Sequence, residues 1–287
     1  MSNEINLTKS YEISNSEFKN LSQLVYDQVG IHLAEQKKML VKTRLSKRLR
    51  ELNFSTFNQY YQFLKNDQTG EELILFINAI STNVTSFFRE PSQWDFLEKE
   101  IKEKEASGQR KLRIWSSACS SGQEPYTIAI FLYSLLKNPQ EWDIKILATD
   151  ISEDILKQAM RAQYSLKDVT GIPKNMLNKF FNKVNMETKT GVKEAYEIKS
   201  VLRNLVLFRS FNLVYGNYKG IPKRFDMIFC RNVMIYFDNE TKEKVVNNLT
   251  SKIIKNGLFF IGHSESLINM KDNKLKLVKP SIYRVPK

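Results

Sequence analysis

The chain has 287 residues, of which 42% are hydrophobic and 26% charged, a composition typical of a globular protein with a sizeable core. No window approaches the roughly 18 apolar residues of a membrane-spanning helix, and the polar start, Met1 to Ser14, lacks the apolar core of a signal peptide. We therefore expect a cytoplasmic protein that is not embedded in a membrane. The net charge of +13 favours anionic partners, but it does not choose among nucleic acid, a membrane surface and an acidic protein.

The first part of the chain is predicted to form a small helical domain over residues 11–75. Ser14-x-x-Glu17 is a capping-box pattern that opens a helix ending before Gly30. Apolar residues at helical spacing predict the other helices. These are expected at about residues 34–52, from Ser55 onward and around residues 73–80, with a loop at residues 66–72.

Strands and helices alternate in the rest of the chain, after a helix expected to begin at Pro91. This alternation predicts an α/β fold over residues 81–287, with a doubly wound, mostly parallel, Rossmann-like sheet. The expected strands are KLRIWS at 111–116, IKILATD at 144–150, FDMIFC at 225–230 and GLFFIG at 257–262. The expected helices end near Leu136, follow Ser152 and cover residues 241–254.

Residues 180–213 break this rhythm. Two strand-like runs, YEIKSV and LVLFRS, lie near a loop rich in Lys, Thr and Gly at residues 187–193. We therefore expect a small antiparallel β insert at about residues 180–210.

Small residues follow the first expected strand, in the segment IWSSACSSGQEP at 114–125. Such a loop lets backbone N–H groups approach a ligand, and the N-terminus of the next helix favours an anionic group there. Only Gly122 is present, so this is not a G-x-G-x-x-G motif. The alternative is an ordinary tight turn between strand and helix.

Polar residues close two further strands at the same expected edge of the sheet. Asp150 is placed to accept hydrogen bonds from two ribose hydroxyls, and its alternative role is the N-cap of the next helix. Arg231 and Asn232 stand inside an apolar run and need partners, because unsatisfied buried polar groups are costly. Those partners are either a ligand or a structural network.

The only two cysteines, Cys119 and Cys230, lie far apart and are expected to be reduced residues of a packed fold. The only two histidines, His32 and His263, belong to no cluster with metal-ligand spacing, so we expect no metal site.

Five segments together resemble the signature segments of the chemotaxis receptor methyltransferase family, CheR, in the family's order. They are STNVTSFFRE (81–90), WSSACSSGQEPYTIAI, ATDIS, FDMIFCRNVMIYF and GHSES (262–266). The helical region before them resembles the family's N-terminal domain. One departure is Gln123, where many members carry an acid, but its neighbour Glu124 keeps the expected position.

The resemblance implies a protein-glutamate O-methyltransferase that uses S-adenosylmethionine to form methyl esters on chemoreceptors during chemotaxis adaptation. Asp150 would bind the ribose, and Arg89 would pair with the cofactor carboxylate unless it forms a surface salt bridge. Tyr236 would face the reacting centre together with Arg231, unless Tyr236 is a core residue, and His263 either lines the site or is structural. The implied cofactor-binding residues are Asn83, Thr85, Arg89, Glu124, Asp150, Asn212, Leu213, Arg231 and Asn232.

A basic run at residues 36–50 has seven Lys and Arg and no acid. Val41, Leu45 and Leu49 mark its buried face, which leaves the basic groups to solvent or to an acidic helical substrate. Family members dock their receptor through this domain, which implies a monomer that binds the cytoplasmic domain of a chemoreceptor. In some members the β insert also binds the receptor's C-terminal tail by strand addition. The docking residues implied are Lys42, Arg44, Lys47, Arg48 and Arg50.

Two other interpretations stay open. The net charge of +13 favours a nucleic-acid methyltransferase, although no aromatic cluster accompanies the basic run and no N-P-P-Y-like motif is present. A non-catalytic S-adenosylmethionine sensor would keep the same binding residues, and only methyl transfer distinguishes it from an enzyme.

Overall fold

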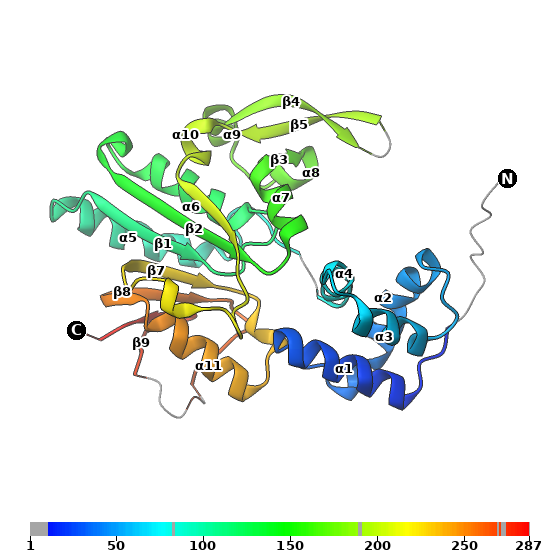
Figure 1. The fold of residues 1–287 in the computed structure, drawn as a ribbon. Coiled ribbons are helices and arrows are strands. Elements are labelled where there is room, and N and C mark those ends of the chain that lie inside the picture. The colour runs from blue at the N-terminus through cyan, green and yellow to red at the C-terminus, as the bar shows by residue number, and fades with distance from the viewer. Residues whose placement is uncertain (1–10, 82–83, 189–190, 269, 271–273, 287) are drawn as a thin grey trace. The chain divides into compact units, whose positions relative to one another are not determined.

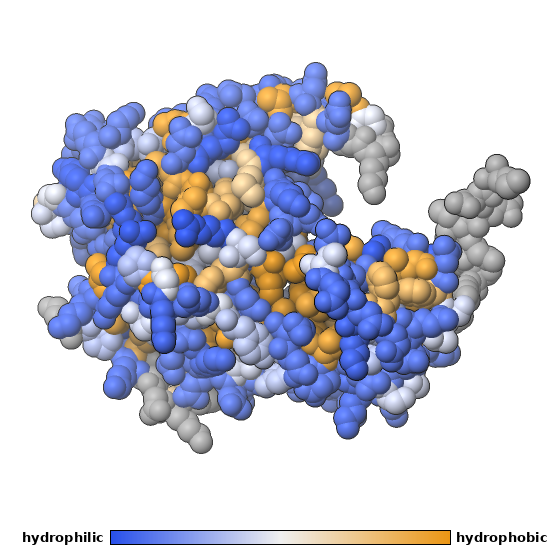
Figure 2. All heavy atoms as spheres, viewed as in Figure 1, coloured by the Kyte–Doolittle hydropathy of each residue, from blue (hydrophilic) through white to orange (hydrophobic). Residues whose placement is uncertain are grey.

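The computed structural model describes residues 11–81, 84–188, 191–268, 270 and 274–286 (Figure 1). The chain divides into two compact units. The helical unit comprises Met1–Asn83 and Tyr236–Asp238, and the sheet unit comprises Val84–Ile235 and Asn239–Lys287. Figure 2 shows hydrophilic residues over most of the visible surface of each unit.

The predicted capping box opens the first helix of the helical unit. The Ser14 hydroxyl accepts the Glu17 N–H at 3.1 Å, and the Glu17 carboxylate accepts the Ser14 N–H at 2.9 Å. The helix ends at Gly30, whose φ of +71° is a left-handed conformation that glycine adopts without strain. The elements of this unit are α1 (Asn15–Val29), the 3₁₀ helix η1 (Glu35–Lys37), α2 (Lys38–Glu51), α3 (Phe57–Asn66) and α4 (Glu71–Ile80).

The core of the helical unit forms as the apolar spacing predicts. Val41, Leu45 and Leu49 of α2 are fully buried. Each such side chain contributes roughly 1.5–3 kcal/mol by leaving water. The loop between α3 and α4 is shorter than predicted, because Asp67 accepts the Glu72 N–H at 2.9 Å and so satisfies a donor of the first turn of α4.

A seven-stranded sheet forms the centre of the sheet unit, in the order β6-β2-β1-β7-β8-β10-β9. The first five strands in this order are parallel, and the last two are antiparallel, so the predicted mostly parallel α/β fold is confirmed. The strands are β1 (Lys111–Ser116), β2 (Asp143–Asp150), β6 (Val206–Ser210), β7 (Phe225–Cys230), β8 (Ile253–Ile261), β9 (Lys276–Lys279) and β10 (Ile282–Arg284). The helices that accompany them are α5 (Pro91–Ala106), α6 (Gln123–Leu135), α7 (Glu153–Arg161), α11 (Asn239–Thr250) and the 3₁₀ helices η2 (Pro139–Glu141), η3 (Tyr218–Gly220) and η4 (Met234–Tyr236).

The central strands are buried, which explains their continuous apolar runs. All six residues of β7 are buried. Across β7 and β8, the rings of Phe229 and Phe260 stack at a centroid distance of 4.3 Å. Trp94 of α5 also stacks with the Phe229 ring, at a centroid distance of 6.0 Å, so this helix packs directly on the sheet.

The predicted insert exists as a separate antiparallel sheet in the order β3-β5-β4. The strands that form this sheet differ from the predicted ones. The run LVLFRS is not part of it, because β6 pairs in parallel with β2 at the edge of the main sheet. The third strand of the insert comes instead from Gln163–Ser165, ahead of the predicted range. The insert elements and their flanking helices are β3 (Gln163–Ser165), α8 (Leu166–Val169), α9 (Lys174–Phe180), β4 (Phe181–Thr188), β5 (Gly191–Ile198) and α10 (Ser200–Arg203).

The predicted helix at residues 241–254 is too long. α11 ends at Thr250, and Ile253 already pairs with Phe225 as the start of β8. Polar Lys255 and Asn256 then interrupt the strand where its register shifts, which hid its first residues from the apolar pattern.

Candidate active site

The predicted binding residues gather at the carboxyl ends of the parallel strands. β1 lies between β2 and β7, and β8 lies beyond β7, so the loops that follow these strands meet at one edge of the sheet. This edge is where open α/β sheets bind their ligands. Ser117 ties the first loop to β7 by donating its N–H to the Phe229 carbonyl at 2.8 Å, and Cys119 ties it to β2 through the Thr149 carbonyl at 2.8 Å.

Gly122 closes the loop after β1 where α6 begins. Its φ is +93°, and a Cβ there would lie 2.9 Å from the Tyr164 hydroxyl and 3.0 Å from the Ala159 Cβ. Only glycine therefore fits this turn. Ser120 in the same loop has a φ of +48°, and its hydroxyl is a buried group without a hydrogen-bond partner in the described part of the chain.

Asp150 stands beside this loop at the end of β2. Its carboxylate accepts the Ser120 N–H at 2.8 Å and the Ser152 N–H at 3.1 Å. The N-cap of α7 is Ser152, whose hydroxyl accepts the Ile155 N–H, so Asp150 is not the cap. Burial raises the pKa of Asp150 above the usual aspartate value, against these backbone hydrogen bonds. An ionised carboxylate has about four lone-pair sites, which leaves acceptor capacity for ribose hydroxyls.

Arg231 follows β7 and is almost fully buried, with 2% of its side chain exposed. Its Nη1 atom lies 3.0 Å from Glu124 of α6, and its Nη2 atom lies 3.1 Å from Glu90. Nη2 also donates to the Arg89 carbonyl at 2.6 Å. The partners of Arg231 are thus other parts of the protein, which form a structural network around it. The two carboxylates and the one guanidinium of this network have a formal net charge of −1.

The two acids of this network are themselves held by hydrogen bonds. Glu90 accepts the His263 N–H at 3.0 Å, and Glu124 accepts the Ser116 hydroxyl at 2.6 Å. Burial opposes the ionisation of Glu90, but the His263 N–H and Arg231 outweigh it and lower the pKa of Glu90. The site therefore presents fixed negative charge, which complements a sulfonium or ammonium group.

The His263 ring is half exposed, and among the described residues it forms no catalytic relay. Its Nε2 atom faces both the Ser92 hydroxyl at 3.4 Å and Glu90 at 3.8 Å. A relay would engage the two ring nitrogens separately.

Asn212 and Leu213 lie beyond β6, next to Asp150, because the Phe211 N–H donates to the Asp150 carbonyl at 2.9 Å. Asn212 accepts the Val214 N–H at 2.9 Å, and Leu213 is buried. These residues therefore join the same edge of the sheet.

The segment before α5 carries three predicted cofactor residues. Arg89 donates to the Val84 carbonyl at 2.9 Å, and Thr85 is half-buried. Asn83 lies outside the described residues. Asn232, with a φ of +58°, follows Arg231 directly.

Tyr236 belongs to the helical unit rather than to the sheet unit. Its carbonyl accepts the His32 N–H at 2.7 Å, and the Lys37 ammonium lies 5.7 Å from its ring centroid. The catalytic role of Tyr236 stays a prediction.

The basic residues of α2 divide into two groups. Arg44 donates to the Ile80 and Ser81 carbonyls at the end of α4, and Arg48 binds the buried Glu72 at 2.5 Å. These two arginines hold the helices of this unit together, while Lys42 pairs with Glu12 at 2.6 Å. Lys47 is 79% exposed, and Arg50 is half-buried.

Three residues of the site were not predicted from the sequence: Ser116, Glu90 and Glu265. Glu90 and Glu265 were visible as acids inside the STNVTSFFRE and GHSES segments. Their spacing alone did not show that they would be buried beside Arg231 and Asn232.

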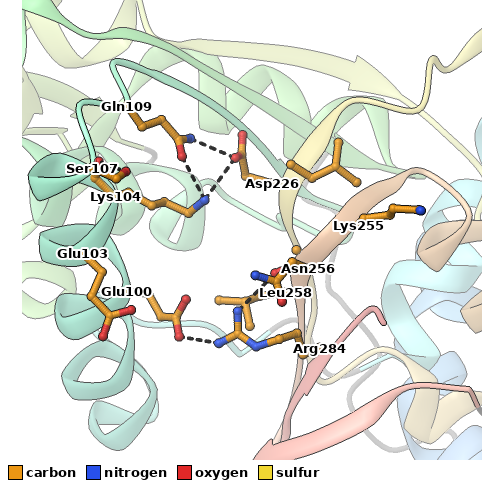
Figure 3. Close-up of a pocket in the computed structure, with 12 residues that line it drawn as sticks. Glu100, Glu103, Lys104, Ser107, Gln109, Asp226, Lys255, Asn256, Leu258 and Arg284 are labelled. Carbon is orange, nitrogen blue, oxygen red and sulfur yellow. Dashed lines mark hydrogen bonds and ion pairs between the residues drawn. The ribbon is translucent and has the colours of Figure 1, made fainter. Parts of the chain in front are cut away.

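A pocket of about 490 Å³ lies at the opposite ends of the strands (Figure 3). Asp226, near the start of β7, pairs there with Lys104 at 3.4 Å, and Glu100 pairs with Arg284. These four charged side chains are thus paired with one another. None of the residues that line this pocket is a predicted site residue. Its lining therefore does not match the predicted cofactor site.

The described residues contain no group of three or more His, Cys, Asp or Glu residues that could hold a metal ion. No helix among them is long and apolar enough to span a membrane. Both cysteines are free and buried, and burial raises the pKa of each thiol.

Comparison with known proteins agrees with this geometry. The family model "CheR methyltransferase, SAM binding domain" matches residues 83–283, and "CheR methyltransferase, all-alpha domain" matches residues 16–81. The chain is 37% identical to a chemotaxis protein methyltransferase of Borreliella burgdorferi, over 98% of both chains. It is 36% identical to that of Salmonella typhimurium, over 93% of this chain and 89% of the relative. Among solved structures, it is similar to magnesium protoporphyrin IX methyltransferase from Synechocystis with bound SAM, with 14% identity and a TM-score of 0.38 over 68% of this chain and 80% of that one. The family models and the relatives show that this chain belongs to the CheR methyltransferase family.

Proposed function

We propose that this protein transfers a methyl group from S-adenosylmethionine to glutamate carboxylates of chemoreceptors, forming methyl esters during chemotaxis adaptation. The observation that carries the proposal is the carboxyl edge of the sheet, where Asp150 and the Arg231–Glu90–Glu124 network meet in a domain of a SAM-binding family. The relatives named above are chemotaxis methyltransferases, which supports the receptor as substrate.

The residues at this edge fit the cofactor. Asp150 would hold the ribose, and Leu213 and Asn212 would border the adenine. The negative charge of Glu90 and Glu124 suits the ammonium and sulfonium groups, while the unpartnered Ser120 hydroxyl offers a further hydrogen bond. The other predicted cofactor contacts, Asn83, Thr85, Arg89 and Asn232, remain part of this proposal.

The chemistry requires little of the protein. S-adenosylmethionine supplies a methyl group that is activated by its sulfonium. The acceptor glutamate has a reference pKa of about 4.3 and is already ionised at neutral pH, so no general base is needed. The side chains at this edge would bind and align the two reactants and exclude water, which supplies most of the rate in such reactions.

We further propose that the receptor's cytoplasmic domain docks on the basic residues of α2 that are not engaged inside the helical unit, and that the enzyme therefore acts in the cytoplasm. Lys47 and Arg50 are the best candidates, because Arg44 and Arg48 are engaged inside the helical unit. β4 is an edge strand of the insert, which supports strand addition by a receptor tail peptide.

Transfer of radiolabelled methyl from S-adenosylmethionine to receptor cytoplasmic fragments tests the function. We expect label on the receptor that mild base removes, since base hydrolyses methyl esters and spares N-methyl groups. Asp150→Ala should abolish it. Absence of label on a folded receptor, despite cofactor binding, would favour the sensor interpretation, and base-stable label would indicate another acceptor.

A further inference from the structure

The GHSES segment contains a buried acid to which the proposed reaction assigns no role. Glu265 is 7% exposed and lies three residues after Gly262, in the loop that follows β8. One of its carboxylate oxygens accepts the N–H groups of Gly262 at 2.6 Å and Asn232 at 3.0 Å, and the other accepts the Met234 N–H at 2.8 Å. One side chain thus joins the loop after β8 to the loop after β7.

The two loops also meet by close packing, independently of these hydrogen bonds. A Cβ on Gly262 would lie 2.6 Å from the Asn232 Nδ2 atom and 3.0 Å from its backbone nitrogen. Asn232 itself has a φ of +58°, in the left-handed region that asparagine adopts more readily than most other non-glycine residues. The Glu265 hydrogen bond to its N–H helps to hold this residue in that conformation.

From this geometry we infer that Glu265 is a positioning residue, which fixes the loop at residues 231–234 and thereby the binding of the methionine part of the cofactor. Arg231 immediately precedes the anchored Asn232, so the direction in which both side chains point depends on this anchor. The inference rests on the proposed cofactor site.

A carboxylate is the group that this position requires. Three backbone N–H donors face two oxygens, and both oxygens of a carboxylate accept hydrogen bonds. A glutamine would direct an NH₂ group at one set of donors and leave at least one buried N–H without an acceptor. Burial raises the pKa of Glu265, and the backbone N–H bonds to the carboxylate oppose this rise.

The test compares two probes by titration calorimetry on the full chain. S-adenosylhomocysteine contains the methionine-derived part, whereas methylthioadenosine lacks the amino and carboxyl groups. For Glu265→Gln we expect the Kd of S-adenosylhomocysteine to rise on the order of tenfold, as for one buried N–H left unpaired, and the Kd of methylthioadenosine to stay within about twofold. The nucleoside end should keep its contacts near Asp150.

The matched control is Asp226→Asn. Asp226 is also a buried carboxylate, and it accepts the Arg113 N–H at 2.9 Å, but it lies at the other end of the strands. This variant should lose comparable thermal stability and bind both probes normally. Equal weakening of both probes in Glu265→Gln, or unchanged binding of S-adenosylhomocysteine, would overturn the inference. Failure of the unmodified protein to bind S-adenosylhomocysteine would instead refute the proposed function.

Discussion

Arg231 shows how single residues hold this site together. The Arg231 side chain is 2% exposed and bridges Glu90 and Glu124, so its removal would leave two carboxylates that are only 10% and 11% exposed without their cation. We expect Arg231→Ala to lower the free energy of unfolding by about 3–5 kcal/mol in chemical denaturation. Lys157→Ala removes a cation from an exposed pair with Asp154 and should cost less than about 1 kcal/mol. Similar losses for both variants would mean that the Arg231 network is not a buried structural one.

Asp150 gives a pH prediction with a defined sign. In the proposed complex the ribose hydroxyls would donate to the ionised carboxylate, and burial raises the pKa of Asp150 above its usual value. The Kd of S-adenosylmethionine should therefore rise as the pH falls into the acidic range, and the rise should begin at a higher pH than an ordinary aspartate would give. Asp150→Asn should bind more weakly and lose that part of the pH dependence. Calorimetry across this range checks both, and the same acidic slope in the variant would assign the titration to another group.

At the scale of elements, the sequence predicted best where one signal was strong and local. The first and last residues of β1 and the capping box at Ser14 and Glu17 were correct because buried runs and caps depend on neighbouring residues. β6 was assigned to the wrong sheet, because a short apolar run does not reveal its pairing partner. The network of Glu90, Glu124 and Arg231 joins residues more than 100 positions apart, so only the sheet topology brings it together.

The helix α2 illustrates that a charge run does not have one role. Arg48 binds Glu72, which is 5% exposed and also accepts the Tyr60 hydroxyl at 2.8 Å. We expect Arg48→Ala to lower the free energy of unfolding by about 3 kcal/mol, because Glu72 would lose its partner. Lys47→Ala should stay within about 0.5 kcal/mol in the same denaturation experiment. If Lys47→Ala proved equally destabilising, the division of α2 into structural and docking residues would be wrong.

At the scale of the whole molecule, the positive charge is concentrated in one part of the sequence. The first 170 residues contain 22 basic and 22 acidic residues, and residues 171–287 contain 22 basic and 9 acidic ones, so this second part carries the entire net charge of +13. The basic run of α2 therefore belongs to a part of the sequence whose net charge is zero. In the proposed complex, long-range attraction of an acidic receptor would therefore depend on residues 171–287, whereas docking on α2 would depend on local contacts.

Salt separates these two contributions, because the Debye length falls from about 10 Å at 0.1 M to about 3 Å at 1 M. Two double variants each lower the net charge by the same amount: Lys47→Glu with Arg50→Glu on α2, and Lys219→Glu with Lys223→Glu on the exposed loop before β7. Both should lower kcat/KM for the receptor at low salt. At high salt the loop variant should match the unmodified protein, while the α2 variant keeps a raised KM because its contacts are lost in the docked complex. Equal behaviour of both variants at every salt concentration would show that α2 contributes net charge alone and is not the docking surface.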